Sequence, residues 1–449
     1  MTGTRQGALA ASGTREGALA AYRTPRRTIG GAFCVLAVAA GAIPFASAAA
    51  QAAPDILVAR DVKIGMRLGP PLRARIFRPA GKTLRPTILS LEADSSDARE
   101  RNARALAEDG YAVVIAEPRG GDDRHAGRDG YDAVEWINDQ PWSDRRVLMA
   151  GTGEGANAAW NAAREHPPHL AAIVTRTPAR PLGWTDTEVR RVVVSALIIA
   201  GSAAEEQGSA VDTYVRYTKV ARDGGAPTAF LVIGSLDATA IAALERRWFD
   251  WASGRSSLPP QLRKSVGFLA MGDSVWQFAD SLEGIGARAT SYPLHSNAGP
   301  RTAPGGFLGG GALDEEPADT VSGDKTYETL LAAPLTLAGR PTVTLWLKHE
   351  EPPRPLVPYQ VRRMLLDEVL ADGTVVRLGE SARGNRIADT TAAPGSAPDR
   401  VEFTTFPWIV RRLAAGSKLR LTVNGAPTII YHDTERYSRV ILPVVRAER

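Results

Sequence analysis

Residues 146–165 read RVLMAGTGEGANAAWNAARE, and this stretch decides the fold. It opens with an apolar run of strand length, 146–150, which stops at Gly151. Residues 155–165 then favour a helix, because after Gly155 they are mainly Ala, with Asn and Trp, and contain no further Gly or Pro. The pattern predicts a buried strand that passes through a glycine-rich turn directly into a helix.

The same alternation continues on both sides of this unit. Further apolar strands are expected at 87–91, 111–116, 171–174, 192–200 and 229–233, and further helices at 97–109, 131–139 and 211–223. Partly alternating segments at 56–58, 62–64 and 72–77 add short strands at the start. Strands that alternate with helices predict an open, mostly parallel α/β sheet flanked by helices.

The pattern changes around residues 254–260, where Pro259 and Pro260 follow Ser and Gly residues. Beyond them, short strands separated by turn residues recur from 267–270 to 438–444, which predicts an all-β jelly roll or sandwich. We therefore expect an α/β domain at 54–254, a linker at 255–263 and a jelly-roll domain at 264–449.

The N-terminus has the pattern of a secretory signal. Three arginines, Arg23, Arg26 and Arg27, precede an apolar run at 29–46 that ends in Ala46-Ser47-Ala48. A basic segment, an apolar segment and a small-residue cleavage site predict a signal peptide over residues 1–53, with an extended basic region. We expect export to the periplasm or the cell exterior and no stable membrane span after cleavage; an uncleaved anchor is the alternative.

The amino-acid composition argues against several kinds of partner and cofactor. Lys plus Arg number 54 and Asp plus Glu 49, and the excess is scattered, so nucleic acid is not an expected partner. The only cysteine, Cys34, lies in the predicted signal, so the mature chain would have no disulfide. Asp122, Asp123, His125 and Asp129 match no metal-site spacing and are expected in a polar loop, so neither metal nor cofactor is expected.

Several motifs, in this order, resemble the X-Pro dipeptidyl-peptidase and cocaine-esterase-like (CocE/NonD) serine hydrolases. The resemblance covers roughly residues 60–446 and rests on the following stretches: DGYDAVEWINDQPWS at 129–143, RWFDW at 247–251, PLTLAG at 334–339, VTLWL at 343–347, LDEV at 366–369 and SRVILPV at 438–444. It implies an α/β-hydrolase domain followed by a jelly-roll domain. It also implies acyl transfer by a serine nucleophile, a histidine base and an aspartate that orients the histidine.

The residues at the positions of this triad cannot perform that chemistry. The glycines of the elbow remain at Gly151 and Gly155, but Gly153 stands where the resemblance places the serine. The aspartate position falls on Ala204 and the histidine position on Ala238.

Two further features of these hydrolases are missing. The resemblance implies an oxyanion-hole tyrosine where the sequence has Glu92-Ala93-Asp94. Only residues 175–191 remain where a helical cap would lie, so the cap is essentially absent.

Two functions remain open. The chain is expected to be a catalytically inactive, exported homologue that binds a peptide, ester or glycan. The alternative is a serine-type acyl hydrolase, a dipeptidyl-peptidase or esterase, with a relocated active site. Glu205, one residue after Ala204, and His125 are its candidate substitute groups.

Overall fold

The computed structural model describes most of the chain beyond the predicted signal. The described residues are 54–93, 96–120, 123–178, 183–201, 204–221, 229–234, 236–296, 305–307, 318–349, 361–382, 385–387 and 398–445. The predicted signal peptide and Cys34 lie outside these residues. Within them, no helix has both the length and the apolar character needed to cross a membrane.

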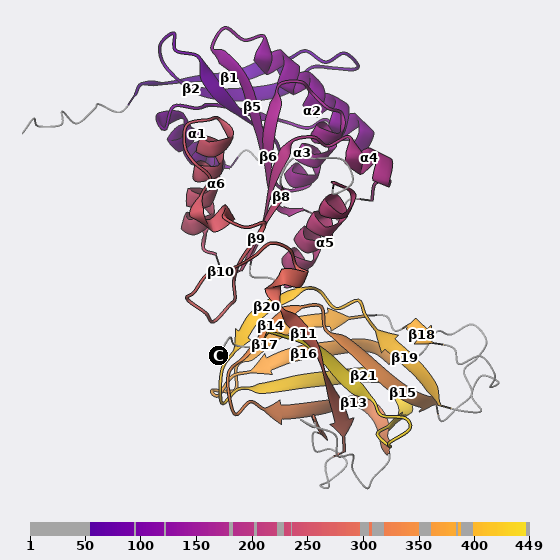
Figure 1. Cartoon of the computed structure of the whole chain (residues 1–449). Helices are drawn as coiled ribbons and strands as arrows, with labels where there is room; N and C mark the ends of the chain where they lie inside the picture. The colour runs from indigo at the N-terminus through magenta and orange to yellow at the C-terminus, as the bar shows by residue number, and fades with distance from the viewer. Residues whose placement is uncertain are drawn as a thin grey trace, which may run out of the picture. The chain divides into compact units, whose positions relative to one another are not determined.

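A ten-stranded sheet forms the first half of the described chain (Figure 1). Its strands, in spatial order, are β1 (Ile56–Ile64), β2 (Leu72–Pro79), β4 (Ala112–Ala116), β3 (Arg85–Leu91), β5 (Ser143–Gly153), β6 (Leu170–Pro178), β7 (Ser195–Ala200), β8 (Ala229–Gly234), β9 (Val266–Leu269) and β10 (Gln277–Ala279). Every neighbouring pair from β4 to β9 is parallel, whereas β1, β2 and β10 pair antiparallel. The expected mostly parallel sheet is confirmed.

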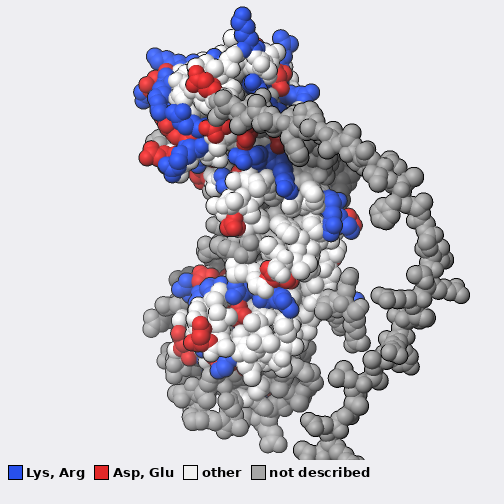
Figure 2. All heavy atoms as spheres, turned by 90° about the vertical axis from the view of Figure 1, so that its left-hand side faces the viewer, with Lys and Arg blue, Asp and Glu red and all other residues white. Residues whose placement is uncertain are grey.

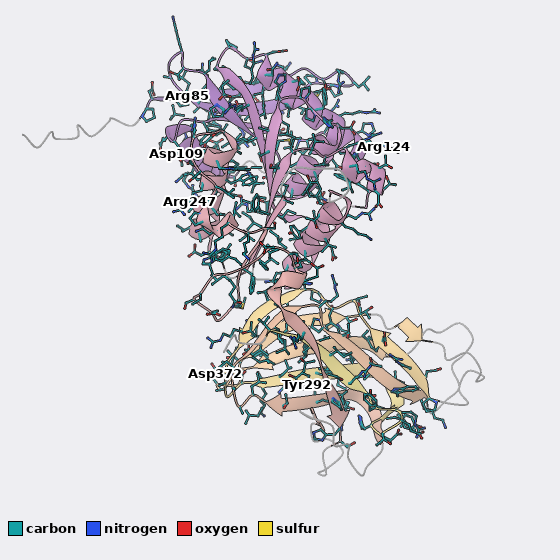
Figure 3. All side chains as sticks on the ribbon, viewed as in Figure 1. Arg85, Asp109, Arg124, Arg247, Tyr292 and Asp372 are labelled. Carbon is teal, nitrogen blue, oxygen red and sulfur yellow. The ribbon has the colours of Figure 1, made fainter. Side chains whose placement is uncertain are left out.

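Helices cover both faces of this sheet. On one side lie α1 (Asp97–Glu108) and α6 (Ala238–Ala252), and on the other lie α2 (Asp123–Asn138), α3 (Glu154–Arg164), α4 (Asp186–Arg190) and α5 (Ala204–Ala221). Figure 3 shows the same division, with Asp109 and Arg247 on the α1 and α6 side and Arg124 on the α2 side. Each side has its own apolar core, because α1 and α6 contribute to one buried cluster and α2, α3 and α5 to another.

The motif at 129–143 acts mainly in positioning α2. Any side chain at Gly130 would overlap the Cβ of Ala162, so the glycine allows α2 to lie directly against α3. Asp132 is buried and accepts a hydrogen bond from the backbone N–H of Arg67 at 2.9 Å. Glu135 contacts the Nδ1 atom of His169 at 2.9 Å. These residues fix the helix that forms one wall of the site described below.

The motif at 247–251 anchors α6. Trp248 and Phe249 are buried, and Asp250 accepts a hydrogen bond from the hydroxyl of Tyr111 at 2.6 Å. Burial and this carboxylate raise the pKa of Tyr111, so the phenol stays protonated and keeps donating. The motif therefore ties α6 to the start of β4.

Ion pairs fix α1 over the antiparallel strands. Glu100 on α1 contacts Arg60 of β1 at 2.7 Å and Arg75 of β2 at 2.8 Å. Figure 2 shows basic and acidic side chains interspersed over the face that carries α1 and α6. The surface charge there is mixed rather than gathered into a patch of one sign.

Two expectations about local structure are wrong. The strand expected at 267–270 was assigned to the jelly roll, but it is β9, which pairs parallel with β8, and β10 extends the same sheet. A short apolar run does not reveal which sheet it joins, because strands of either sheet can be buried on both faces.

The second error concerns α2. Its predicted start was residue 131, but the helix begins at Asp123. His125 and Asp129 therefore lie on a helix and not in a polar loop, while Asp122 falls outside the described residues. The first two turns of α2 consist mostly of polar residues. A helix is recognised in a sequence by the spacing of its apolar residues, so these turns gave no helical signal.

The second half of the described chain is all β. Its strands are β11 (Ala287–His295), β12 (Gly305–Phe307), β13 (Ala318–Leu330), β14 (Leu335–Gly339), β15 (Thr342–His349), β16 (Val361–Val369), β17 (Val375–Ser381), β18 (Asn385–Ile387), β19 (Asp399–Phe403), β20 (Ile409–Leu413), β21 (Lys418–Tyr431) and β22 (Arg439–Val445). All pair antiparallel except β12 with β13.

Long strands with three partners close this region around its own core. β21 pairs with β13, β15 and β16, and β22 pairs with β11, β14 and β15. Leu345, Phe403 and Leu421 are among the fully buried side chains that they enclose. The expected separate antiparallel β region is therefore present.

Candidate functional site

The site is built around the turn between β5 and α3. Gly153 is the last residue of β5 and the N-cap of α3, with φ of +56° and ψ of −118°. This backbone conformation is costly for a residue with a Cβ and is accessible to glycine. A Cβ at Gly151 would overlap the main-chain carbonyl group of Gly155. The sharp strand-to-helix elbow expected from the glycine spacing is therefore formed.

The tip of the elbow has room for a side chain. A Cβ built on Gly153 would have no heavy atom of the described residues within 4 Å, apart from its chain neighbours. Contact with neighbouring residues therefore does not exclude a serine at this position, although the positive φ makes any side chain there strained. The elbow is present, but its tip residue is a glycine, which has no side chain that could act as a nucleophile in acyl transfer.

The other two positions of the triad lie at the same edge of the sheet. Ala204 is the first residue of α5, which follows β7, and Ala238 is the first residue of α6, which follows β8. Parallel strands end at a common edge, so these positions and Gly153 share the edge where open α/β sheets bind ligands. Ala238 is exposed, and neither alanine carries a group that can accept or hold a proton.

Of the two candidate substitute groups, only the side chain of His125 is described by the structure. His125 is exposed on α2 and does not line the cavity beside Gly153. Glu205 lies in α5, but its side chain is outside the described residues. Among the side chains that the structure describes, no three metal-ligating groups lie together.

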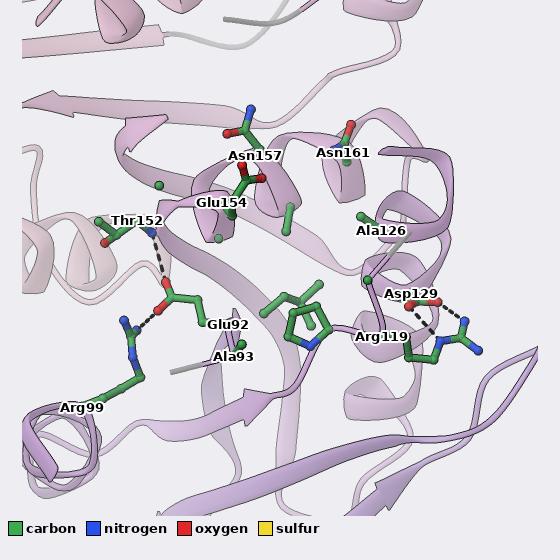
Figure 4. A pocket seen from close by; sticks show the side chains of 16 residues that line it. Glu92, Ala93, Arg99, Arg119, Ala126, Asp129, Thr152, Glu154, Asn157 and Asn161 are labelled. Atoms are coloured by element: carbon green, nitrogen blue, oxygen red, sulfur yellow. Dashed lines mark hydrogen bonds and ion pairs between the residues drawn. The ribbon is translucent and has the colours of Figure 1, made fainter. Parts of the chain in front are cut away.

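A cavity of about 480 Å³ opens beside Gly153 (Figure 4). It is bounded by the end of β3, by Arg99 of α1, by the loop after β4, by α2 and by the first turns of α3. Leu91, Ala93, Pro118, Ala126 and Ala158 provide its apolar wall. The cavity combines this apolar wall with a limited set of polar side chains, which is the usual composition of a small-molecule site.

Glu92 opens the segment Glu92-Ala93-Asp94, in which the resemblance implies an oxyanion-hole tyrosine; Asp94, the last residue of that segment, lies outside the described residues. The side chain of Glu92 is only 7% exposed, pairs with Arg99, and accepts a hydrogen bond from the backbone N–H of Thr152 at 3.0 Å. A carboxylate is an acceptor and carries negative charge, so it opposes the build-up of negative charge on a substrate oxygen. The carboxylate of Glu92 therefore cannot donate a hydrogen bond to a substrate oxygen as a tyrosine hydroxyl would.

A second carboxylate–arginine pair lies near the first. Arg176 at the end of β6 contacts Glu245 of α6 at 3.0 Å. Burial raises the pKa of Glu245 above its ordinary value; Arg176 opposes this rise and Glu92 adds to it. Among the described residues of this edge, Glu92 and Glu245 are each paired with an arginine.

The opposite wall of the cavity is fixed by Arg119 and Asp129. Asp129 is 3% exposed, and its Oδ2 accepts from the Nε of Arg119 at 3.0 Å. The same guanidinium donates to the main-chain oxygens of Leu68 at 2.7 Å and Pro70 at 3.1 Å. Asp129, singled out from the sequence only as a weak metal candidate, instead holds the loop after β4 against α2.

Two asparagines of α3 were missed by the sequence reasoning. Asn157 and Asn161 are buried, lie one helical turn apart and both line the cavity. Their spacing of four residues places them on one face of the helix. Two asparagines spaced four residues apart in an alanine-rich helix could have been recognised from the sequence as candidate site residues.

Residues 69–251 match the family model described as X-Pro dipeptidyl-peptidase (S15 family). None of the curated proteins searched matches the sequence. Three solved structures of similar fold have less than 15% identity to this chain, so they show the fold alone.

The first is a CocE/NonD family hydrolase from Staphylococcus aureus, with 12% identity, 87% of this chain and 94% of that chain covered, and a TM-score of 0.64. An alpha-amino acid ester hydrolase has 14% identity, 90% and 100% coverage and a TM-score of 0.66. An aminopeptidase from a marine sediment Thaumarchaeota archaeon has 12% identity, 91% and 99% coverage and a TM-score of 0.64. Together with the family match, these likenesses confirm the expected resemblance of this chain to the X-Pro dipeptidyl-peptidase (S15) and CocE/NonD hydrolases.

Proposed function

We propose that this protein is an exported, catalytically inactive member of the hydrolase fold that acts by binding a small peptide or ester in the cavity beside Gly153. One observation carries the proposal: the elbow keeps its backbone geometry and open tip, but its tip residue is a glycine. A scaffold without a nucleophile can still present the cavity that the nucleophile would have served.

The loss extends beyond one residue. Removal of a single triad member from a serine hydrolase lowers the rate by several orders of magnitude, and here the three positions are Gly153, Ala204 and Ala238. The carboxylate of Glu92 adds an unfavourable charge next to the elbow. We infer that the chain has no serine-dependent acyl-transfer activity.

The binding part of the proposal is supported by the cavity. Its volume of about 480 Å³ lies within the range of about 300–1,000 Å³ that is common for small-molecule sites. Similar structures bear the names of an amino acid ester hydrolase and an aminopeptidase, which favours peptides and esters over glycans as first ligands to test.

A fluorophosphonate probe provides the direct experiment on the purified chain, because labelling requires an activated serine. We expect no labelling of the native protein, with an active serine esterase as the positive control in the same reaction. Stoichiometric labelling that maps to a serine near the elbow edge would contradict the proposal and support a relocated active site.

A further inference from the structure

Two arginine–carboxylate pairs line the cavity, and in each pair the carboxylate is the more buried member. The side chain of Glu92 is 7% exposed beside Arg99 at 23%, and that of Asp129 is 4% exposed beside Arg119 at 22%. Figure 4 shows the two pairs on opposite sides of the view. A buried charge is stable only when it is paired, and the pairing neutralises the partner as well. Both arginines are therefore compensated by the protein itself.

Arg119 has little hydrogen-bonding capacity left for a ligand. A guanidinium has five N–H donors. The Nε of Arg119 donates to Asp129 at 3.0 Å, its Nη2 donates to the same carboxylate, and its Nη1 donates to the main-chain oxygens of Leu68 at 2.7 Å and Pro70 at 3.1 Å. A ligand carboxylate would have to displace Asp129 to form the bidentate pair that arginine prefers.

The N-terminus of α3 also borders the cavity, and by itself it would favour an anion. Two carboxylates already offset its positive field. Glu154 lies in the first turn of the helix, and Glu92 accepts a hydrogen bond from the backbone N–H of Thr152 at 3.0 Å. A ligand carboxylate at this end of the cavity would meet two like charges, which disfavour its ionised form.

The balance of charge is thus unfavourable to an anion throughout the cavity. Among the described residues that line it, the carboxylates Glu92, Asp129 and Glu154 outnumber the arginines. The apolar wall would in addition remove water from a charged ligand group, which is costly without a new partner. An ester or an amide has the same carbonyl group without the charge and avoids both costs.

We propose that this cavity discriminates between a carboxylic ester or amide and the corresponding free acid: it binds the uncharged form and rejects the carboxylate. The inference rests on the proposed function, because it assumes that the cavity binds a small peptide or ester. It adds the chemistry of the ligand, whose carboxyl group must be esterified or amidated where it enters the cavity.

Three derivatives of 3-phenylpropionic acid test the discrimination. 3-Phenylpropionamide and methyl 3-phenylpropionate are uncharged at neutral pH, whereas 3-phenylpropionate is an anion. Calorimetric titration of the purified full chain with each compound gives three dissociation constants. We expect at least one uncharged compound to bind about tenfold more tightly than the carboxylate.

Two substitutions in one pair should shift this preference in opposite directions. Asp129→Asn removes the charge that compensates Arg119, so the preference for the uncharged compound should fall to about threefold or less. Arg119→Gln leaves the charge of Asp129 uncompensated, so the preference should rise by about threefold or more. A mere disturbance of α2 would move both variants the same way.

Asp132→Asn is the matched control. Asp132 lies on the same helix as Asp129, is likewise buried, pairs with Arg67 and accepts a hydrogen bond from its backbone N–H at 2.9 Å. Neither Asp132 nor Arg67 is among the residues that line the cavity. The preference for the uncharged compound should be unchanged in this variant.

The outcomes separate this inference from the proposed function. If the wild type binds the carboxylate as tightly as the uncharged compounds, the inference is overturned while binding in the cavity stands, and this comparison needs no variant to fold. Shifts in the same direction in Asp129→Asn and Arg119→Gln would overturn it as well. Binding of none of the three compounds would count against both. Steady hydrolysis of the methyl ester would contradict catalytic inactivity, and the amide and the carboxylate would still decide the inference.

Discussion

The carboxylate of Glu92 accepts a hydrogen bond from the backbone N–H of Thr152, the residue immediately before the elbow tip, at a distance of 3.0 Å. A Cβ at Gly155, two residues after the tip, would also overlap the Glu92 side chain. The end of β3 and the elbow are thus locked together by a charged group. The hydrogen bond stabilises the shape of the elbow. It also places a negatively charged carboxylate beside the elbow, where it would disfavour an oxyanion.

The first prediction concerns the missing triad. Gly153→Ser alone should give no ester or Xaa-Pro peptide hydrolysis above background, because the other two triad positions, Ala204 and Ala238, carry neither a base nor a group to orient one. Gly153→Ser combined with Ala204→Asp and Ala238→His should give weak but measurable turnover in a chromogenic ester assay. Wild-type activity that persists after each serine near the elbow is replaced would contradict the assignment of this elbow as the former active site.

The second prediction concerns the charge beside the elbow. Adding Glu92→Gln to that triple variant should increase its turnover by roughly tenfold, because a neutral amide no longer repels the developing oxyanion. A stability measurement must accompany the assay, since the change weakens the pair with Arg99. A variant that folds well but turns over no faster would show that Glu92 does not oppose the oxyanion.

The third prediction concerns the ion pair itself. Glu92→Leu should destabilise the protein by about 3 kcal/mol, because it leaves the partly buried Arg99 without its carboxylate. Glu92→Leu with Arg99→Leu should recover part of this loss, because both charges are removed together. Urea unfolding of the two variants checks this, and an equally large loss in the double variant would indicate that packing rather than charge is responsible.

The fourth prediction concerns the glycines of the elbow. Gly151→Ala should destabilise the fold by about 3 kcal/mol, because the new methyl group would overlap the main chain of Gly155. Gly183→Ala is the matched control, since no heavy atom of the described residues lies within 4 Å of its Cβ position. Similar melting temperatures for the two variants would contradict the tight turn at 151–155.

The fifth prediction is a pH dependence. A hydrogen bond from Arg60, with Arg75 alongside, lowers the pKa of Glu100 from its ordinary value of 4.5 to about 2. A lowered folded-state pKa stabilises the fold fully above about pH 4.5, and this contribution is lost as the pH falls toward 2. Urea midpoints should therefore fall more steeply for the wild type than for Glu100→Gln between pH 4.5 and 2.5. Parallel slopes would show that this carboxylate titrates normally.

Export remains a proposal based on the sequence. The arginines before the apolar run at 29–46 and the Ala46-Ser47-Ala48 site motivate it. N-terminal sequencing of secreted material should begin close to Ala49 or Ala53. A soluble cytosolic protein that still carries Tyr22 would argue against cleavage.

The sequence by itself determined the elements whose signals are local. The alternation of apolar runs and helices predicted the parallel sheet, and the glycine spacing at 151–155 predicted the elbow, because both depend on residues close together in the chain. The motif resemblance also placed glycine and alanine at the triad positions. None of these conclusions required knowledge of distant contacts.

Only the tertiary structure decided what surrounds the elbow. Glu92 and Thr152 are sixty residues apart, and no sequence period reveals that a carboxylate of one strand meets a backbone N–H of another. The close packing of α2 on α3 depends on Gly127 and Gly130, which lie directly against residues 161 and 162 of the other helix. The assignment of β9 to the first sheet likewise depends on the free edge of β8. Local propensity selects the elements, but the partners of each exposed edge and buried polar atom are set by long-range packing.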